Sequence, residues 1–251
     1  MTEQAFPIVD THQHVDPWPL PGRWGGIELN VRLNQLRGID IAIISSGQAI
    51  VHDMVEGNAR LAEALEGYPQ LYGYVTVNPT VLELSRKELE RYADNPKFVG
   101  VKIHTHYSGC PLGDPRLDLM LELLEEWGKP LLLHTWGKTA ISHLDTLAQR
   151  HPSLPILVAH AGGDAWRDAI AIAQKRPNLY LDFVCSTPYA GSIARGLRIL
   201  GAKRIVFGTD ATLFDPLYMK SIYDHTPMTP EERRLIMGGN ALRIFGLDPS
   251  P

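Results

Sequence analysis

The chain has 251 residues, of which 44% are hydrophobic and 21% charged, a balance typical of a globular protein that buries a sizeable core. Lys and Arg number 24 against 28 Asp and Glu, so the net charge of −4 excludes a basic surface for nucleic acid or anionic membranes. Two cysteines are too few for a disulfide framework. With no signal-peptide pattern and no apolar run near the roughly 18 residues of a membrane span, we expect a cytoplasmic protein.

Short apolar runs recur along the chain at intervals of roughly 23 to 32 residues, the length of a strand, a helix and two loops. Most are continuous rather than alternating, as expected of parallel strands that are buried on both faces. The predicted strands are Ile8–Thr11, Ile39–Ser45, Leu71–Val77, Phe98–His104, Pro130–Thr135, Ile156–His160, Leu179–Val184 and Arg204–Thr209.

Helical patterns fill several of the intervening segments. Met54–Leu65, Leu82–Tyr92 and Leu117–Trp127 carry apolar residues at helical spacing, and Gly128 is suited to end the third of these helices. Thr229-Pro230-Glu231-Glu232 predicts a helix start, with a capping residue, a proline at the first helical position and acids in the first turn.

Eight strands that alternate with helices within about 250 residues predict a somewhat distorted (β/α)8 TIM barrel, with the active site at the C-terminal ends of the strands. We expect one domain over residues 1–251. A doubly wound open sheet is the rival fold, but the turn after the first strand, His12–Pro17, lacks the glycine-rich pattern G-x-G-x-x-G.

Histidines gather at the predicted active-site end of the barrel. His12 and His14 are two residues apart on one strand, so both side chains face the same way and can bind one ion. A histidine from the fifth strand and an acid from the eighth can complete the ligand shell. Imidazole and carboxylate suit Zn²⁺, with Mn²⁺, Fe²⁺, Co²⁺ or Ni²⁺ as alternatives. Six of the ten histidines lie at strand ends: His12, His14, His104, His106, His134 and His160.

Each of these features also has an ordinary structural interpretation. His134 or His160 alone could be a core histidine bonded to backbone, and Asp210 could be a helix N-cap. The metal site is favoured because four separate segments place a ligand type at the same end of a strand.

These residues, in this order, resemble the amidohydrolase superfamily, specifically the amidohydrolase-2 branch of metal-dependent barrel hydrolases and decarboxylases. The resemblance covers nearly the whole chain. Its segments are Val9–His14, Gly100–His104, Leu133–Thr135, Ala159–Gly163, Phe207–Asp210 and Gly239–Leu247.

The resemblance implies that His12, His14, His134 and Asp210 bind one divalent ion, with Zn²⁺ as the first choice. It implies that His160 holds a water or polarises the substrate, or binds a second ion in a binuclear site. Lys102 would bridge two ions only if it were carbamylated; otherwise it is a cation that binds substrate. Because Lys102 and His104 share a face of their strand, the sequence does not decide which of them lies at the bridging level.

The first functional hypothesis is a metal-dependent hydrolase that acts on an amide, a lactone or another ester. A bound divalent ion lowers the pKa of its water from 15.7 towards about 7. Asp210 would take the proton from this water and pass it to the leaving group, and His160 would stabilise the oxyanion.

The second hypothesis is a metal-dependent, non-oxidative decarboxylase of an aromatic or unsaturated acid, in which Lys102, His104 or Arg195 holds the anionic substrate. We rank it second because the chain is compact for that group. The third is a metal-free barrel that binds a ligand. For all three we expect a small-molecule partner and neither nucleic acid nor membrane. Members of this branch are often dimers, so a homodimer is one expected state.

Two further features bear on the pocket. The segment Asp16–Gly26 is rich in Pro, Gly and Trp, which predicts either a lid or a rigid crossover packed on the barrel rim. Trp136 follows His134 closely and could form a flat substrate-binding wall, although aromatic residues near a barrel mouth more often serve packing alone.

Overall fold

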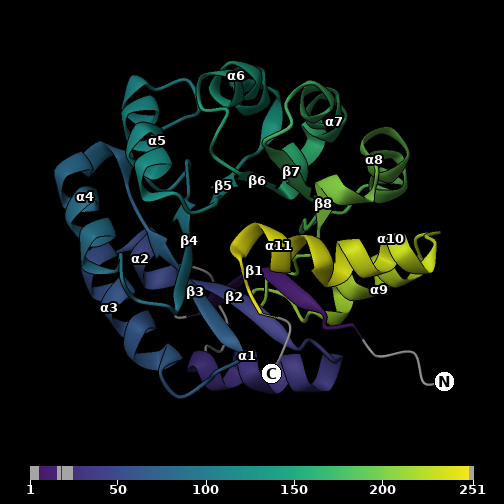
Figure 1. The fold of residues 1–251 in the computed structure, drawn as a ribbon, viewed down its shortest axis with the longest axis horizontal. Helices are drawn as coiled ribbons and strands as arrows, with labels where there is room; N and C mark the ends of the chain where they lie inside the picture. Colours follow the sequence, from purple (N-terminus) through teal and green to yellow (C-terminus); the bar gives the residue numbers. More distant parts are fainter. Residues whose placement is uncertain (1–5, 16–17, 19–24, 249–251) are drawn as a thin grey trace.

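Eight parallel strands alternate with helices in the computed structural model, which describes residues 6–15, 18 and 25–248 (Figure 1). The strands follow one another around a single sheet in sequence order, from β1 to β8. Their bounds are β1 Val9–Val15, β2 Ile41–Ser46, β3 Leu71–Thr76, β4 Phe98–Ile103, β5 Leu131–His134, β6 Ile156–Ala159, β7 Leu179–Asp182 and β8 Ile205–Val206.

The helices lie around the outside of the sheet, and the last one lies across one end (Figure 1). They are α1 Gly26–Arg37, α2 Gly47–Val51, α3 Met54–Leu65, α4 Leu82–Arg91, α5 Pro115–Trp127, α6 Gly137–Arg150, α7 Trp166–Lys175, α8 Ser192–Leu200, α9 Leu217–His225, α10 Pro230–Arg234 and α11 Asn240–Phe245. Short turns of 3₁₀ helix span Pro79–Val81, His160–Ala165 and Ala202–Arg204, and a π-helical turn spans Leu235–Gly239.

Backbone hydrogen bonds between β1 and the segment after β8 close the sheet into a barrel. The amide of Thr11 donates to the carbonyl of Phe207 at 2.9 Å, and the amide of Asp210 donates to the carbonyl of His12 at 2.8 Å. Gln13 forms a parallel bridge with Ala211. The predicted (β/α)8 barrel is therefore confirmed.

The barrel interior is apolar at one end and polar at the other. Val9, Ile43 and Val206 belong to a buried cluster that also includes residues of α11. The rings of Tyr74 and Phe245 meet there at 5.8 Å between centroids, so α11 covers this end of the barrel. A larger apolar cluster fills the layer between strands and outer helices. The polar side chains are thereby confined to the opposite end, where the strands finish.

The predicted end of one helix at Gly128 and the predicted start of another at Thr229 are confirmed by their capping. Asp114 accepts a hydrogen bond from the amide of Arg116 at the start of α5, and Gly128 ends this helix with a φ of 72°. Thr229 and Glu232 form a reciprocal capping box at the start of α10.

The two strands that meet at the closure differ from their predicted bounds. β1 runs on past Thr11 to Val15 with a register irregularity between Asp10 and Gln13, whereas β8 ends early at Val206. The predicted lid segment Asp16–Gly26 lies largely outside the described residues, apart from Trp18, Gly25 and Gly26. Within the described part of the chain, no helix has the length and apolarity needed to cross a bilayer.

Candidate active site

Three buried side chains converge at the polar end of the barrel. His12 and His14 come from β1, and Asp210 lies in the segment after β8. One candidate ligand atom from each lies within 4.8 Å of the others. Asp210 Oδ1 is 3.0 Å from His14 Nε2 and 3.6 Å from His12 Nε2. This arrangement brings together three of the four predicted metal ligands.

Hydrogen bonds on the far side of each imidazole fix its orientation. His12 Nδ1 is 2.7 Å from Asp182 Oδ2, and His14 Nδ1 is 2.8 Å from Ser45 Oγ. Each ring therefore presents Nε2 towards Asp210. A carboxylate behind a histidine is a common support for metal ligation, because it fixes the ring and makes its free nitrogen more basic.

Sequence reasoning missed Asp182 and Ser45. Asp182 is the last residue of β7, where an acid interrupts the apolar run of Leu179–Val184. The rule that located Asp210, an acid at the carboxyl end of a strand, also applies to this residue. Ser45 near the end of β2 carries no comparable signal, because buried serines are common.

The protonation of these groups follows from their burial. Burial lowers the pKa of both His12 and His14, so the rings are neutral at neutral pH. Burial also favours the neutral acid of Asp210, but the hydrogen bond from His14 and nearby positive charges outweigh it, so the pKa of Asp210 lies below its usual value. Neutral imidazoles beside an ionised carboxylate are the state that a metal ion requires of its ligands.

Lys102 adds a buried cation to this cluster. The residue lies on β4 with no exposed surface, and its Nζ is 3.4 Å from His12 Nε2. Burial lowers the pKa of Lys102 to about 8, although Asp210 and Asp182 partly oppose the shift. At neutral pH the side chain is still mostly charged.

His104, which shares a strand face with Lys102, is placed differently. Its ring stacks on His134, with centroids 3.8 Å apart and an angle of 16° between the planes. Of this pair, Lys102 contacts His12 of the three-donor cluster formed by His12, His14 and Asp210, and His104 stacks on His134.

His134 and His160 form a second pair of imidazoles beside the three donors. His160 Nε2 is 3.1 Å from His134 Nδ1, and His160 Nδ1 donates to the carbonyl of Val184 at 3.0 Å. Burial lowers the pKa of His160 to about 4. Among the described residues, the group of mutually close donors contains His12, His14 and Asp210 but not His134. The role of His134 as a fourth ligand stays a prediction.

The backbone at both predicted catalytic residues is strained. Among the described residues, only three that are not glycine have a φ in the left-handed region: His160 at 63°, Ala161 at 47° and Asp210 at 60°. A side chain in this region costs roughly 1–2 kcal/mol. Strain of this kind clusters at functional sites, where the surrounding fold holds it in place.

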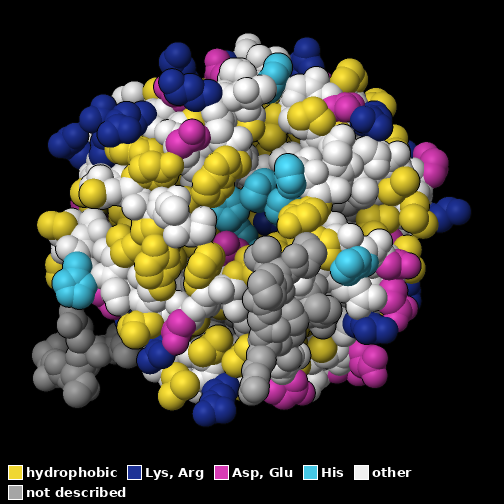
Figure 2. Space-filling model, turned by 180° about the vertical axis from the view of Figure 1, so that it is seen from behind, with side chains coloured by type: hydrophobic (Ala, Val, Ile, Leu, Met, Phe, Trp, Pro, Cys, Tyr) yellow, Lys and Arg dark blue, Asp and Glu magenta, His cyan; other side chains and the backbone are white. Residues whose placement is uncertain are grey.

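A pocket of about 330 Å³ opens over the cluster and is lined by several aromatic rings. Trp18 lies 4.9 Å from His14 between ring centroids. Trp136, which we predicted to bind substrate, lines the same pocket, as do Lys102 and His104. Figure 2 shows imidazoles gathered in a hollow of this face, bordered by apolar side chains. Arg195, in contrast, lies exposed on α8 and is not among the lining residues.

Comparison with known proteins places this site in a family. A family model described as amidohydrolase matches residues 9–247. The 2-amino-3-carboxymuconate-6-semialdehyde decarboxylase of Dictyostelium discoideum is 24% identical over 240 residues, covering 77% of this chain and 66% of that protein. The chain thus spans just under two thirds of that relative's length.

Solved structures with the same fold include two benzoate decarboxylases. The 2,6-dihydroxybenzoate decarboxylase from Rhizobium has a TM-score of 0.77 and 17% identity, with 97% of this chain and 100% of that chain covered. The dihydroxybenzoic acid decarboxylase from Polaromonas, with bound manganese and the inhibitor 2-nitroresorcinol, has a TM-score of 0.74 and 18% identity, with coverage of 97% and 98%. At such identities the likeness shows the fold alone.

These relatives correct one prediction. The hydrolase hypothesis is wrong, because the three relatives described above are decarboxylases by name, as in our second hypothesis. The physical reason is that imidazoles, a carboxylate and a buried lysine at a barrel mouth serve either chemistry. The compact chain, which led us to rank decarboxylation second, does not separate the two, since this barrel aligns with all of the Rhizobium decarboxylase chain.

The family match over residues 9–247 includes every strand of the barrel and all three donors of the cluster. Only short segments at the two ends of the chain stay unmatched, and the protein therefore belongs to the amidohydrolase family.

Proposed function

We propose that the protein is a metal-dependent lyase that removes carbon dioxide from a small aromatic or unsaturated carboxylic acid. The observation that carries the proposal is the buried cluster of His12, His14 and Asp210 with the Lys102 ammonium beside it. A metal site next to a buried lysine suits a substrate that brings its own carboxylate, because an unpaired buried cation is costly. The decarboxylases among the relatives act on acids of this kind.

We assign His12, His14 and Asp210 as ligands of a divalent ion, with His134 as the fourth. Two imidazoles and a carboxylate suit Zn²⁺ and Mn²⁺ alike, and manganese is present in the Polaromonas relative. A bound ion would supply Lewis acidity at the carboxylate and a neighbouring oxygen of the substrate.

The side chains around the cluster then have separate tasks. The Lys102 ammonium attracts the carboxylate, while His104 and Trp136 form walls of the pocket in which the acid lies. Cleavage of the bond to the carboxylate carbon releases carbon dioxide and leaves an electron pair on the neighbouring carbon. A proton must reach that carbon. Asp210 and His160, which line the same pocket, are the side chains that we propose to hold and deliver it.

The proposal is tested by carbon dioxide release from the manganese-loaded or zinc-loaded protein. The panel consists of 2,6-dihydroxybenzoate, 5-carboxyvanillate and 2-amino-3-carboxymuconate semialdehyde. In heavy water, the product should carry one deuterium at the carbon that lost the carboxylate. The matched control is Asp210→Asn, which should release no carbon dioxide above background. Metal-loaded protein that binds these acids without releasing carbon dioxide would refute the decarboxylase.

A metal analysis separates this proposal from a metal-free binding barrel. We expect purified protein to hold a divalent ion, or to gain activity when Mn²⁺ or Zn²⁺ is added. Less than a tenth of an equivalent of metal, without activation by either ion, would favour the metal-free alternative.

A further inference from the structure

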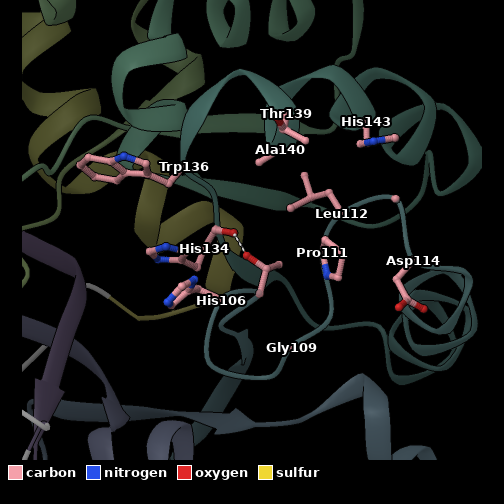
Figure 3. Close-up of a pocket in the computed structure, with 12 residues that line it drawn as sticks. His106, Gly109, Pro111, Leu112, Asp114, His134, Trp136, Thr139, Ala140 and His143 are labelled. Atoms are coloured by element: carbon pink, nitrogen blue, oxygen red, sulfur yellow. Dashed lines mark hydrogen bonds between the residues drawn. The ribbon is translucent and has the colours of Figure 1, made fainter.

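A second cavity, of about 800 Å³, lies beside the metal pocket, between the loop that follows β4 and the start of α6 (Figure 3). His106, His134 and Trp136 line both cavities. The two cavities therefore adjoin at these side chains.

The middle of this cavity is apolar. In Figure 3, Pro111, Leu112 and Ala140 lie between the imidazoles of His106 and His134 at one end and His143 at the other. Among the described residues that line it there is no lysine or arginine. The cavity therefore suits a flat apolar group better than an anionic one.

The one acid among the described lining residues is paired with an arginine. Asp114 accepts hydrogen bonds from the Arg116 side chain at 2.6 and 3.0 Å and from the Arg116 amide at 2.9 Å. These contacts with Arg116 lower the pKa of Asp114 to about 2. Because this carboxylate caps α5 and its charge is balanced by Arg116, the described part of the lining offers no unpaired acid to a cationic ligand.

Two glycines allow side chains of the cavity wall to pack directly against the backbone. A Cβ at Gly163 would lie 2.7 Å from Cδ2 of Trp136, so this indole rests directly on backbone while remaining 42% exposed. A Cβ at Gly113 would lie 2.8 Å from Cε1 of His143, so the far wall is equally close-packed. The ring of Trp136 thus packs against the Gly163 backbone where the two cavities adjoin.

The geometry points to a substrate in two parts, an acid head at the three-donor cluster and an uncharged, flat apolar extension, such as a second ring, in the second cavity. This inference rests on the proposed function and names its substrate class. The metal pocket of about 330 Å³ is near the lower end of the roughly 300–1,000 Å³ common for ligand pockets and suits a single ring. A one-ring acid bound at the cluster would leave the adjoining cavity of about 800 Å³ unfilled.

Binding of unreactive ligands tests the inference without requiring turnover. The nitro group of 2-nitroresorcinol takes the place of a carboxylate and cannot leave as carbon dioxide. Titration calorimetry on the manganese-loaded protein would compare this compound with its 4-phenyl and 5-phenyl derivatives. We expect at least one derivative to bind about tenfold or more tightly than the parent, because a phenyl ring is removed from water.

Filling the cavity should cancel this gain. In Ala140→Phe, the phenyl derivative should lose its advantage while the parent keeps its affinity within twofold. Ala171→Phe, at an exposed alanine of α7, is the matched control and should change neither. Thr139→Phe, at an exposed lining residue, replaces Ala140→Phe if that variant fails to fold.

The outcomes separate the two proposals. If neither phenyl derivative gains affinity, or if the gain survives in the filled variants, the two-part substrate is refuted even where one-ring acids release carbon dioxide. If the gain is present and cancelled by Ala140→Phe, but neither the acids of the panel nor phenyl-substituted 2,6-dihydroxybenzoates release carbon dioxide, the two-part ligand stands and the decarboxylase is refuted.

Discussion

Asp182→Asn tests whether the carboxylate behind His12 prepares this ring for a metal ion. Asp182 Oδ1 accepts from the amide of Val184 at 3.0 Å, and Oδ2 lies 2.7 Å from His12 Nδ1. An asparagine that keeps the bond to Val184 must present its NH₂ group to His12. Nδ1 then accepts, and the ring proton moves to Nε2, the atom that faces Asp210.

The size of the effect follows from this hydrogen bond. A bond to a charged group contributes about 1.5–3 kcal/mol. At about 1.4 kcal/mol for each factor of ten, we expect metal affinity to fall roughly 10- to 100-fold. Burial raises the pKa of Asp182 well above its usual value, so the charged carboxylate is costly at neutral pH. The metal-free variant should therefore unfold at no lower temperature than wild type.

The assay is calorimetric titration of Mn²⁺ into protein first stripped of metal, with thermal unfolding in parallel. Asp145→Asn is the matched control, because Asp145 pairs with Arg176 on the outside of the barrel. Weaker metal binding together with unchanged stability supports the reasoning. A change in affinity below twofold would refute it, since the orientation of His12 would then not depend on Asp182.

Three other substitutions probe the strained backbone at Asp210, the buried cation Lys102 and the packing of Trp136 on Gly163. Asp210→Asn should abolish turnover and weaken metal binding with an unchanged circular dichroism spectrum; near-normal activity would remove Asp210 from the mechanism. Burial lowers the pKa of Lys102 from 10.5 to about 8. In metal-free protein below pH 8, the charged side chain therefore lowers the free energy of unfolding by about 3 kcal/mol. This loss of stability shrinks as the pH rises from 8 to 10.5. Lys102→Met should therefore be more stable than wild type in denaturant at pH 7 by an amount that shrinks towards pH 10.5, and a difference that stays constant over this range contradicts the shift. Gly163→Ala, with a φ of 60° and a Cβ 2.7 Å from Trp136, should lose about 1 kcal/mol or more of stability and alter indole fluorescence, whereas Gly67→Ala, which meets no atom within 4 Å, should do neither.

The barrel could be predicted because its signals are local. An apolar run followed at once by a histidine or an acid marks both the strand and its active-site end, as in Ile156–His160. The predicted strand bounds are wrong at some strand ends, because closure of the barrel decides where these strands stop. β8 stops at Val206 because the following segment turns to bond β1, and this pairing between distant parts of the chain leaves no mark in sequence periodicity.

The site was predicted less completely, for a related reason. His12, His14 and Asp210 each end or follow an apolar run, and the structure brings them together. Ser45 and the second cavity depend on which loops and helices meet in space, and no motif records this. The spacing of the predicted ligands could not identify the reaction either, because similar donors support more than one chemistry at a barrel mouth.

The left-handed backbone at His160, Ala161 and Asp210 has a consequence for engineering this chain. Glycine is the residue that this conformation tolerates best, so Ala161→Gly would relieve backbone strain without removing a predicted site residue. At 160 and 210 a glycine would relieve the same strain but would also discard the imidazole and the carboxylate together with their hydrogen bonds. A search for thermostable variants of these segments should therefore vary residue 161 and leave His160 and Asp210 unchanged.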